Sequence, residues 1–235
     1  MTADKVRLPS ASSSADVDAF LADLARAPAA RTGGRGRLIF ALDATASRQP
    51  TWDRACRIQG EMFDATATLG GLEVRLLFYR GFAECKASRW LQSAAELHKT
   101  MRAVSCIGGE TQIERVLSHA IAETKTHKVN AMVFVGDAME ENVDRLCQLA
   151  GELGLLGTPV FVFHEGGDAA AGEAFRQIAK LSRGAYLRFD LASADRLKEL
   201  LAAIAVYAAG GYRALADYGA RTGGDIRLLT AQLQD

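Results

Sequence analysis

Short runs of consecutive apolar residues, separated by segments with helical periodicity, constrain the fold of this chain more than any other feature. The runs are RLIFAL (37–42), VRLLFY (74–79), AMVFVG (131–136), VFVFH (160–164) and AYLRF (185–189). Strands that are buried on both faces of a parallel sheet need such unbroken runs. Between the runs, apolar residues recur at helical spacing, as at Ile113, Val116 and Leu117, which indicates helices that lie on a sheet. This order predicts an α/β fold.

The predicted architecture is a doubly wound, mainly parallel six-stranded sheet with helices on both faces. Five strands come from the apolar runs. We expect the sixth near FAECKAS (82–88), as a short antiparallel edge strand that follows the second run. In such a sheet the ligand site lies outside the carboxyl ends of the strands.

The chain divides into three predicted parts. Residues 1–36 should form a flexible leader with one short helix, because ADVDAFLADLARAP (15–28) has one apolar face and a Gly-rich stretch follows it. We expect this helix to pack on the main domain rather than to bind a partner. Residues 37–210 should form the α/β domain. Residues 211–235 hold too many apolar side chains for a free end, and they are predicted to dock on the domain or on a partner.

Charge and composition exclude several classes of function. The 28 basic and 28 acidic residues cancel, so the chain has no electrostatic footprint for nucleic acid or for an anionic membrane. Neither a secretory signal nor the roughly 18 apolar residues of a membrane span occurs, and we therefore expect a cytoplasmic protein. The four cysteines stand far apart, which signals neither a zinc site nor a disulfide framework. The alanine- and arginine-rich composition is compatible with a bacterial source.

Oxygen-bearing side chains follow two of the predicted strands. LIFALDATAS (38–47) places Asp43, Thr45 and Ser47 at alternate positions, a spacing that suits a hard cation. Asp137 follows the run AMVFVG in the same way. Thr111 follows a Gly-Gly pair at a probable helix start, where a threonine is on its own best explained as an N-cap.

These motifs together resemble the von Willebrand factor A (VWA) family. Its metal-ion-dependent adhesion site (MIDAS) has the pattern Asp-x-Ser-x-Ser, then Thr, then Asp. The resemblance covers roughly residues 37–210 and implies a Rossmann-like VWA fold. Carried over, Asp43, Thr45 and Ser47 would form the first metal loop, Thr111 the second and Asp137 the third. The chain departs from the family at Thr45, where Ser is usual, and after Asp137, where an alanine replaces a common glycine.

The resemblance implies a binding module and not an enzyme. Two carboxylates and three hydroxyls suit Mg²⁺, with Mn²⁺ or Ca²⁺ as alternatives. In the family, the bound metal accepts an Asp or Glu side chain of a partner protein, and bacterial relatives often work beside ATPases or chaperone-like complexes. Glu110, Glu140 and Glu141 adjoin the predicted ligands in sequence. We expect them to be solvated surface carboxylates.

Two other functions stay open. DATAS also has the outline of a haloacid-dehalogenase-type loop, in which Asp43 would be the nucleophile of a phosphohydrolase. Against this hypothesis, Thr45 occupies the place of that group's second Asp, and the end of the second strand lacks the required Ser or Thr. A metal-independent scaffold that uses its terminal segments for contact is the third hypothesis. Among the histidines, His164 deserves notice because it lies near the predicted site edge.

Overall fold

The computed structural model describes residues 14–26, 35–58, 60–66, 71–189 and 194–222. The strands are β1 (Gly36–Asp43), β2 (Leu72–Arg80), β3 (Glu84–Ala87), β4 (Ala131–Gly136), β5 (Val160–Glu165) and β6 (Tyr186–Phe189). The helices are α1 (Ser14–Arg26), the 3₁₀ turn η1 (Ala46–Arg48), α2 (Gln49–Ile58), α3 (Gly60–Thr66), α4 (Ala94–Arg102), α5 (Ile113–Thr126), α6 (Val143–Leu155), α7 (Ala169–Leu181) and α8 (Ala194–Thr222).

The strands form one six-stranded sheet in the order β3-β2-β1-β4-β5-β6. All neighbours pair in parallel except β2 and β3, which are antiparallel. The predicted doubly wound, mainly parallel sheet is therefore confirmed, including its antiparallel edge strand. The strand order reverses between β1 and β4. Strand β2 lies on one side of β1, and β4 lies on the other side. A ligand site is expected at the carboxyl ends of these two strands.

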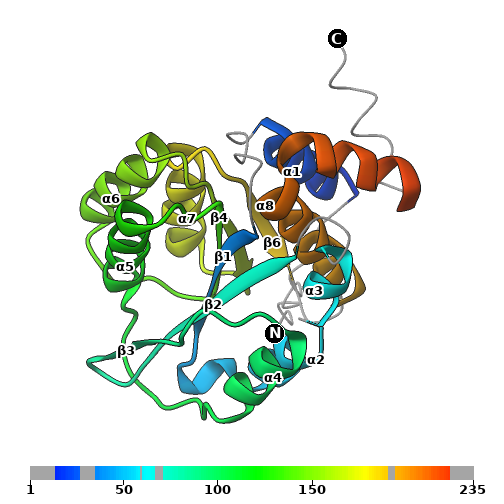
Figure 1. Cartoon of the computed structure of the whole chain (residues 1–235). Helices are drawn as coiled ribbons and strands as arrows, with labels where there is room; N and C mark the ends of the chain where they lie inside the picture. Colours follow the sequence, from blue (N-terminus) through cyan, green and yellow to red (C-terminus); the bar gives the residue numbers. More distant parts are fainter. Residues whose placement is uncertain (1–13, 27–34, 59, 67–70, 190–193, 223–235) are drawn as a thin grey trace, which may run out of the picture.

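Each face of the sheet is covered by its own set of helices (Figure 1). Alternate residues of β1 point to opposite faces, so Leu38 and Phe40 join one apolar core while Ile39 and Ala41 join the other. Helices α1, α2, α3, α4 and α8 pack on the first core, and α5, α6 and α7 pack on the second. Burial on both faces explains why the strand sequences are continuously apolar.

Helices α1 and α8 can be compared with the three predicted parts of the chain, because α1 lies in the first part and α8 crosses the boundary at residue 210. Helix α1 buries Val17, Phe20 and Leu24 in the first core. Helix α8 continues past the predicted boundary at residue 210 and bends at Gly211, which has φ 71°. The boundaries of the three parts stay a prediction. The chain after Thr222, which holds Ile226, Leu228, Leu229 and Leu233 of the predicted docking segment, lies outside the described residues.

No helix within the described ranges has the length and apolar character that a membrane crossing requires.

Candidate metal centre

The end of β1 holds Asp43 in a fixed orientation. Its side chain is 2% exposed. Oδ1 accepts a hydrogen bond from the Thr45 backbone N–H at 2.7 Å, and Oδ2 accepts one from the Tyr79 hydroxyl at 3.0 Å. Tyr79 pairs with Asp43 in the register of β1 and β2, so the sheet itself places the phenol beside the carboxylate. The carboxylate is thereby locked at the carboxyl edge of the sheet.

Hydroxyl groups connect the loop after β1 to the end of β4. Thr45 Oγ1 lies 3.3 Å from Ser47 Oγ. Ser47 Oγ in turn donates to Asp137 Oδ2 at 3.0 Å. Three of the predicted ligands therefore form a continuous chain, and Asp43 joins it through the backbone of Thr45.

Thr111 is held by a different set of contacts. Its backbone N–H donates to Glu140 Oε2 at 3.0 Å, and the Glu140 backbone N–H donates to Thr111 Oγ1 at 3.2 Å. This reciprocal pair ties the loop before α5 to the segment just after Asp137. It is not the expected N-cap, because Gln112 is the residue at the helix start and its side chain makes no capping bond. No direct hydrogen bond joins Thr111 to the other four predicted ligands among the described residues.

Glu110 and Glu140 are exposed, as expected, but Glu140 also bonds to Thr111, and Glu141 is only partly exposed. Glu141 accepts hydrogen bonds at both carboxylate oxygens, from the backbone N–H groups of Ile113 and Glu114. These amides belong to the first turn of α5, where backbone N–H groups have no acceptor within the helix. The Gln112 side chain makes no capping bond there. Together with the Glu140–Thr111 pair, this contact fixes the start of α5 beside Asp137. The contact spans 28 residues in the sequence, so no local pattern predicts it.

The negative charge of Asp137 acts on the carboxyl group of Asp43. Burial raises the pKa of Asp43, and the negative charge of Asp137 raises it further, while the Thr45 N–H and the Arg48 guanidinium act in the opposite direction. Burial and the neighbouring Asp43 raise the pKa of Tyr79, which keeps its phenol protonated as a hydrogen-bond donor. Two close carboxylates in a partly buried place favour a cation between or beside them.

The donor set fits a divalent metal ion. Asp137 Oδ1 is buried and accepts no hydrogen bond from any described residue, which leaves a carboxylate oxygen for a ligand. The neighbouring donors are carboxylate and hydroxyl oxygens, the ligands that Mg²⁺ and Ca²⁺ prefer. Within the described residues no group of three or more His, Cys, Asp or Glu side chains is placed to hold a metal. A site here would therefore rest on two aspartates and neutral hydroxyls.

Arg48 and His164 complete the surroundings. Arg48 is buried and forms an ion pair with Glu165 at the end of β5. His164 is also buried, and its Nδ1 lies 2.8 Å from the Tyr186 hydroxyl while its ring packs edge-on against Phe175. Burial lowers the pKa of His164. The histidine is thus a packed side chain rather than an accessible group at the site edge.

Exposed apolar side chains stand beside the candidate centre. Ile107 is 45% exposed and Phe82 is 77% exposed. The backbone of Ile107 bonds to Ala44 in the first predicted metal loop at 3.0 Å and to Gly81, the neighbour of Phe82, at 3.4 Å. A Cβ at Gly109 would lie 2.0 Å from the Gly81 oxygen, so this glycine permits the two loops to touch. The loop that carries Ile107 therefore joins the first predicted metal loop to the turn that carries Phe82.

Comparison with known proteins gives matches by structure alone. No protein-family model matches the sequence, and no curated protein matches it. Proximal thread matrix protein 1 from the mussel byssus, solved with a zinc-occupied MIDAS motif, superposes with a TM-score of 0.57 at 14% identity. The match covers 75% of this chain and 46% of the mussel protein. The SpRpn10 VWA domain superposes with a TM-score of 0.54 at 11% identity, over 73% of this chain and 94% of that domain.

The chain has the von Willebrand factor A fold. The pilus adhesin SpaC from Lactobacillus rhamnosus GG is similar as well, with a TM-score of 0.57 at 10% identity over 81% of this chain and 31% of the adhesin. The chain spans less than half of the mussel protein and about a third of the adhesin. At these identities the VWA fold is what the likeness establishes.

Proposed function

We propose that this chain is a metal-dependent protein-binding module. Asp43, Thr45, Ser47, Thr111 and Asp137 would hold Mg²⁺, and the module would bind a partner through an Asp or Glu of that partner. The observation that supports this proposal most directly is the buried, unpartnered Oδ1 of Asp137 at the end of a hydroxyl chain that begins at Thr45. Mn²⁺ or Ca²⁺ would suit the same oxygen donors.

Each residue has a distinct task in this proposal. Asp137 and Asp43 supply the charge that compensates the ion, and Ser47 keeps the Asp137 carboxylate in place through its hydrogen bond. Tyr79 and the Thr45 N–H orient Asp43, each of whose oxygens keeps a second lone pair. When bound, the metal supplies a coordination position that an external carboxylate can occupy. The two aspartates just balance the charge of a divalent ion. Because they add no excess negative charge, the ion can still accept an external carboxylate.

The surroundings favour a protein as the partner. Phe82 and Ile107 expose apolar side chains on loops that are bonded to the first predicted metal loop, and apolar side chains near a polar site are a feature of protein interfaces. Following the family resemblance, the proposed partner is an ATPase or a chaperone-like complex.

The same geometry argues against Asp43 as a phosphohydrolase nucleophile. Both oxygens of Asp43 accept hydrogen bonds, and the side chain is 2% exposed. In-line attack on phosphorus needs an approach path as wide as a phosphoryl group, whereas a metal ion needs only one free lone pair of the carboxylate. A binding module without catalytic activity therefore agrees better with this carboxylate than the haloacid-dehalogenase alternative does.

Metal binding is the first test. Titration calorimetry with Mg²⁺ and Mn²⁺ should show one site in the wild type. Asp137→Asn should lower the affinity by about tenfold or more, since changes even outside the ligand shell cost about 10–100-fold. Asp144→Asn, at an exposed aspartate in the first turn of α6, is the matched control and should bind as the wild type does. Broadening of the amide signals of Ser47 and Asp137 by Mn²⁺ would locate the ion.

Partner capture is the second test. Capture from extracts of the native cell should retain the same protein with Mg²⁺, and should lose it with EDTA or with Asp137→Asn. If the wild type binds no divalent ion at millimolar concentration, the metal-dependent mechanism is wrong and a metal-independent scaffold takes its place.

A further inference from the structure

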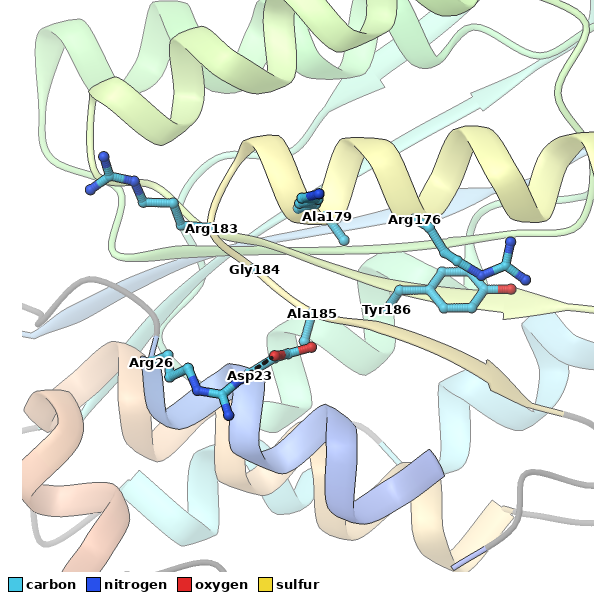
Figure 2. A pocket seen from close by; sticks show the side chains of 9 residues that line it. Asp23, Arg26, Arg176, Ala179, Arg183, Gly184, Ala185 and Tyr186 are labelled. Atoms are coloured by element: carbon cyan, nitrogen blue, oxygen red, sulfur yellow. Dashed lines mark hydrogen bonds and ion pairs between the residues drawn. The ribbon is translucent and has the colours of Figure 1, made fainter. Parts of the chain in front are cut away.

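A basic groove lies at the open edge of the sheet, away from the carboxyl ends of β1 and β4. Its volume is about 570 Å³. Figure 2 shows that α1 forms one wall and α7 the other, with the chain from Gly184 to Tyr186 between them. We call this the edge groove; its lining residues are Asp23, Arg26, Arg176, Ala179, Lys180, Arg183, Gly184, Ala185 and Tyr186.

Positive charge dominates the edge groove. Among the described residues, four cations line it, and the single lining carboxylate, Asp23, already pairs with Arg26 at 3.1 Å. Arg176 pairs with Glu173 at 3.1 Å and lies over the Tyr186 ring at 5.0 Å. Lys180 and Arg183 are exposed and have no ion pair with any described residue. The groove therefore has positive charge available for an acidic ligand.

The floor of the edge groove offers an unpaired backbone edge. Among the described residues, β6 is the last strand of the sheet and pairs only with β5. The Ala185 carbonyl accepts a hydrogen bond from Val162 of β5 at 2.8 Å. A trans peptide points its carbonyl and its N–H in opposite directions, so the Tyr186 N–H points away from β5 toward the open edge. An added strand would meet this donor.

We propose that the edge groove binds an extended, acidic segment of a partner protein, which adds to the sheet as a strand beside β6. Successive side chains of an added strand point to opposite faces, so alternate acidic residues would face Arg176 and Lys180 on α7. The backbone edge would supply affinity and the cations selectivity. A second copy of this edge is a poor occupant, because the cations of the two copies would repel each other.

A designed peptide tests this proposal directly. The probe is a fluorescein-labelled hexapeptide in which Glu alternates with Thr, and its matched control alternates Lys with Thr. Fluorescence anisotropy should show binding of the acidic peptide alone. The double variant Lys180→Glu, Arg183→Glu should bind it about tenfold or more weakly. The double variant Lys99→Glu, Arg102→Glu makes the same charge change in the last turn of α4 and should bind within about twofold of the wild type.

Two further measurements separate strand addition from simple charge attraction and from the metal centre. A probe with N-methylated backbone amides should bind about tenfold or more weakly, and the bound acidic probe should protect the Tyr186 N–H from hydrogen exchange. EDTA should leave binding unchanged, whatever the fate of the metal-dependent function. Equal binding of the methylated probe, equal binding of the Lys peptide, or an unaffected Lys180→Glu, Arg183→Glu variant would overturn the proposal.

Discussion

Asp43 shows how a single residue of the candidate centre depends on contacts in two directions along the chain. The Thr45 N–H holds one of its oxygens from the adjoining loop, and Tyr79 holds the other from the neighbouring strand. The first contact follows from the local motif. The second follows from the parallel register, in which Asp43 and Tyr79 are partners. A sequence pattern finds Asp43 readily, but it finds Tyr79 only after the strand order and register are known.

At the same scale, the predicted ligands differ in how well their positions could be foreseen. Ser47 and Asp137 are joined by a hydrogen bond, as expected for residues that follow neighbouring parallel strands. Thr111 and Glu141 behave differently, because the start of α5 takes its stabilising contacts from the segment after β4. These contacts arise from loop packing. No periodicity in the sequence encodes them.

His119 provides a prediction about pH. Burial lowers its pKa; Glu123, 3.8 Å away, opposes this shift, and Arg75 adds to it. The folded state therefore binds a proton less readily than the unfolded state does. The free energy of unfolding should be unaffected by His119 well above pH 6.5 and should decrease as the pH falls below about 6.5.

The variant His119→Gln removes this proton linkage. In urea titrations, the decrease in the free energy of unfolding between about pH 7 and 5 should be smaller for the variant than for the wild type. His127→Gln, at an exposed position just after α5, controls for the loss of a histidine. An unchanged pH dependence in His119→Gln would show that this imidazole contributes nothing to acid sensitivity.

At the scale of elements, strands were easier to predict than helix ends. Each of the five apolar runs forms a strand, because burial on both faces demands an unbroken run. The paired glycines Gly210 and Gly211 lie inside α8, although such a pair is typical of a helix end. Instead the chain bends at Gly211, continues to Thr222 and buries Leu215 against the first core. A glycine signal marks a change of direction, while tertiary packing decides whether another helical segment follows.

The crossing of β1 and α8 gives a prediction about an element contact. A Cβ at Gly36 would lie 2.4 Å from the Ala209 Cα and 2.5 Å from the Ala208 oxygen. Both obstacles are backbone atoms and cannot move without shifting the helix. Gly36→Ala should therefore lower the free energy of unfolding by about 1–3 kcal/mol in urea titrations.

Gly151 within α6 is the matched control for Gly36. A Cβ there meets nothing within 4 Å, so Gly151→Ala should raise the free energy of unfolding by about 0.5–1 kcal/mol through helix propensity. Changes of the same sign in both variants would contradict the close approach of β1 and α8.

At the scale of the whole molecule, the sheet separates two apolar cores. The helices of one core are close together in the sequence, and those of the other are far apart. The core with α5, α6 and α7 is built from helices that follow one another between strands, whereas the other combines α1 from one end with α8 from the other. Helical periodicity in the sequence predicts α1. It did not reveal that Phe20 would meet Phe161 and Phe163, with ring centroids 6.1 and 5.3 Å apart. Contacts between distant segments depend on the completed fold.

The position of α1 leads to the last prediction, which also tests whether residues 1–36 are a separable leader. Phe20 is 1% exposed and packs against β5. Phe20→Ala should lower the free energy of unfolding by about 3–5 kcal/mol, because truncation of a buried aromatic side chain leaves a cavity. That is a large part of the roughly 5–15 kcal/mol that stabilises an ordinary domain. Leu155→Ala, at a side chain that is 85% exposed, is the matched control and should change stability by about 0.5 kcal/mol or less. Urea unfolding should show one transition for the wild type and an earlier single transition for Phe20→Ala, since loosening α1 weakens the core that it shares with α8. A loss below about 1 kcal/mol would mean that α1 is dispensable and that the domain begins at the predicted boundary near residue 37.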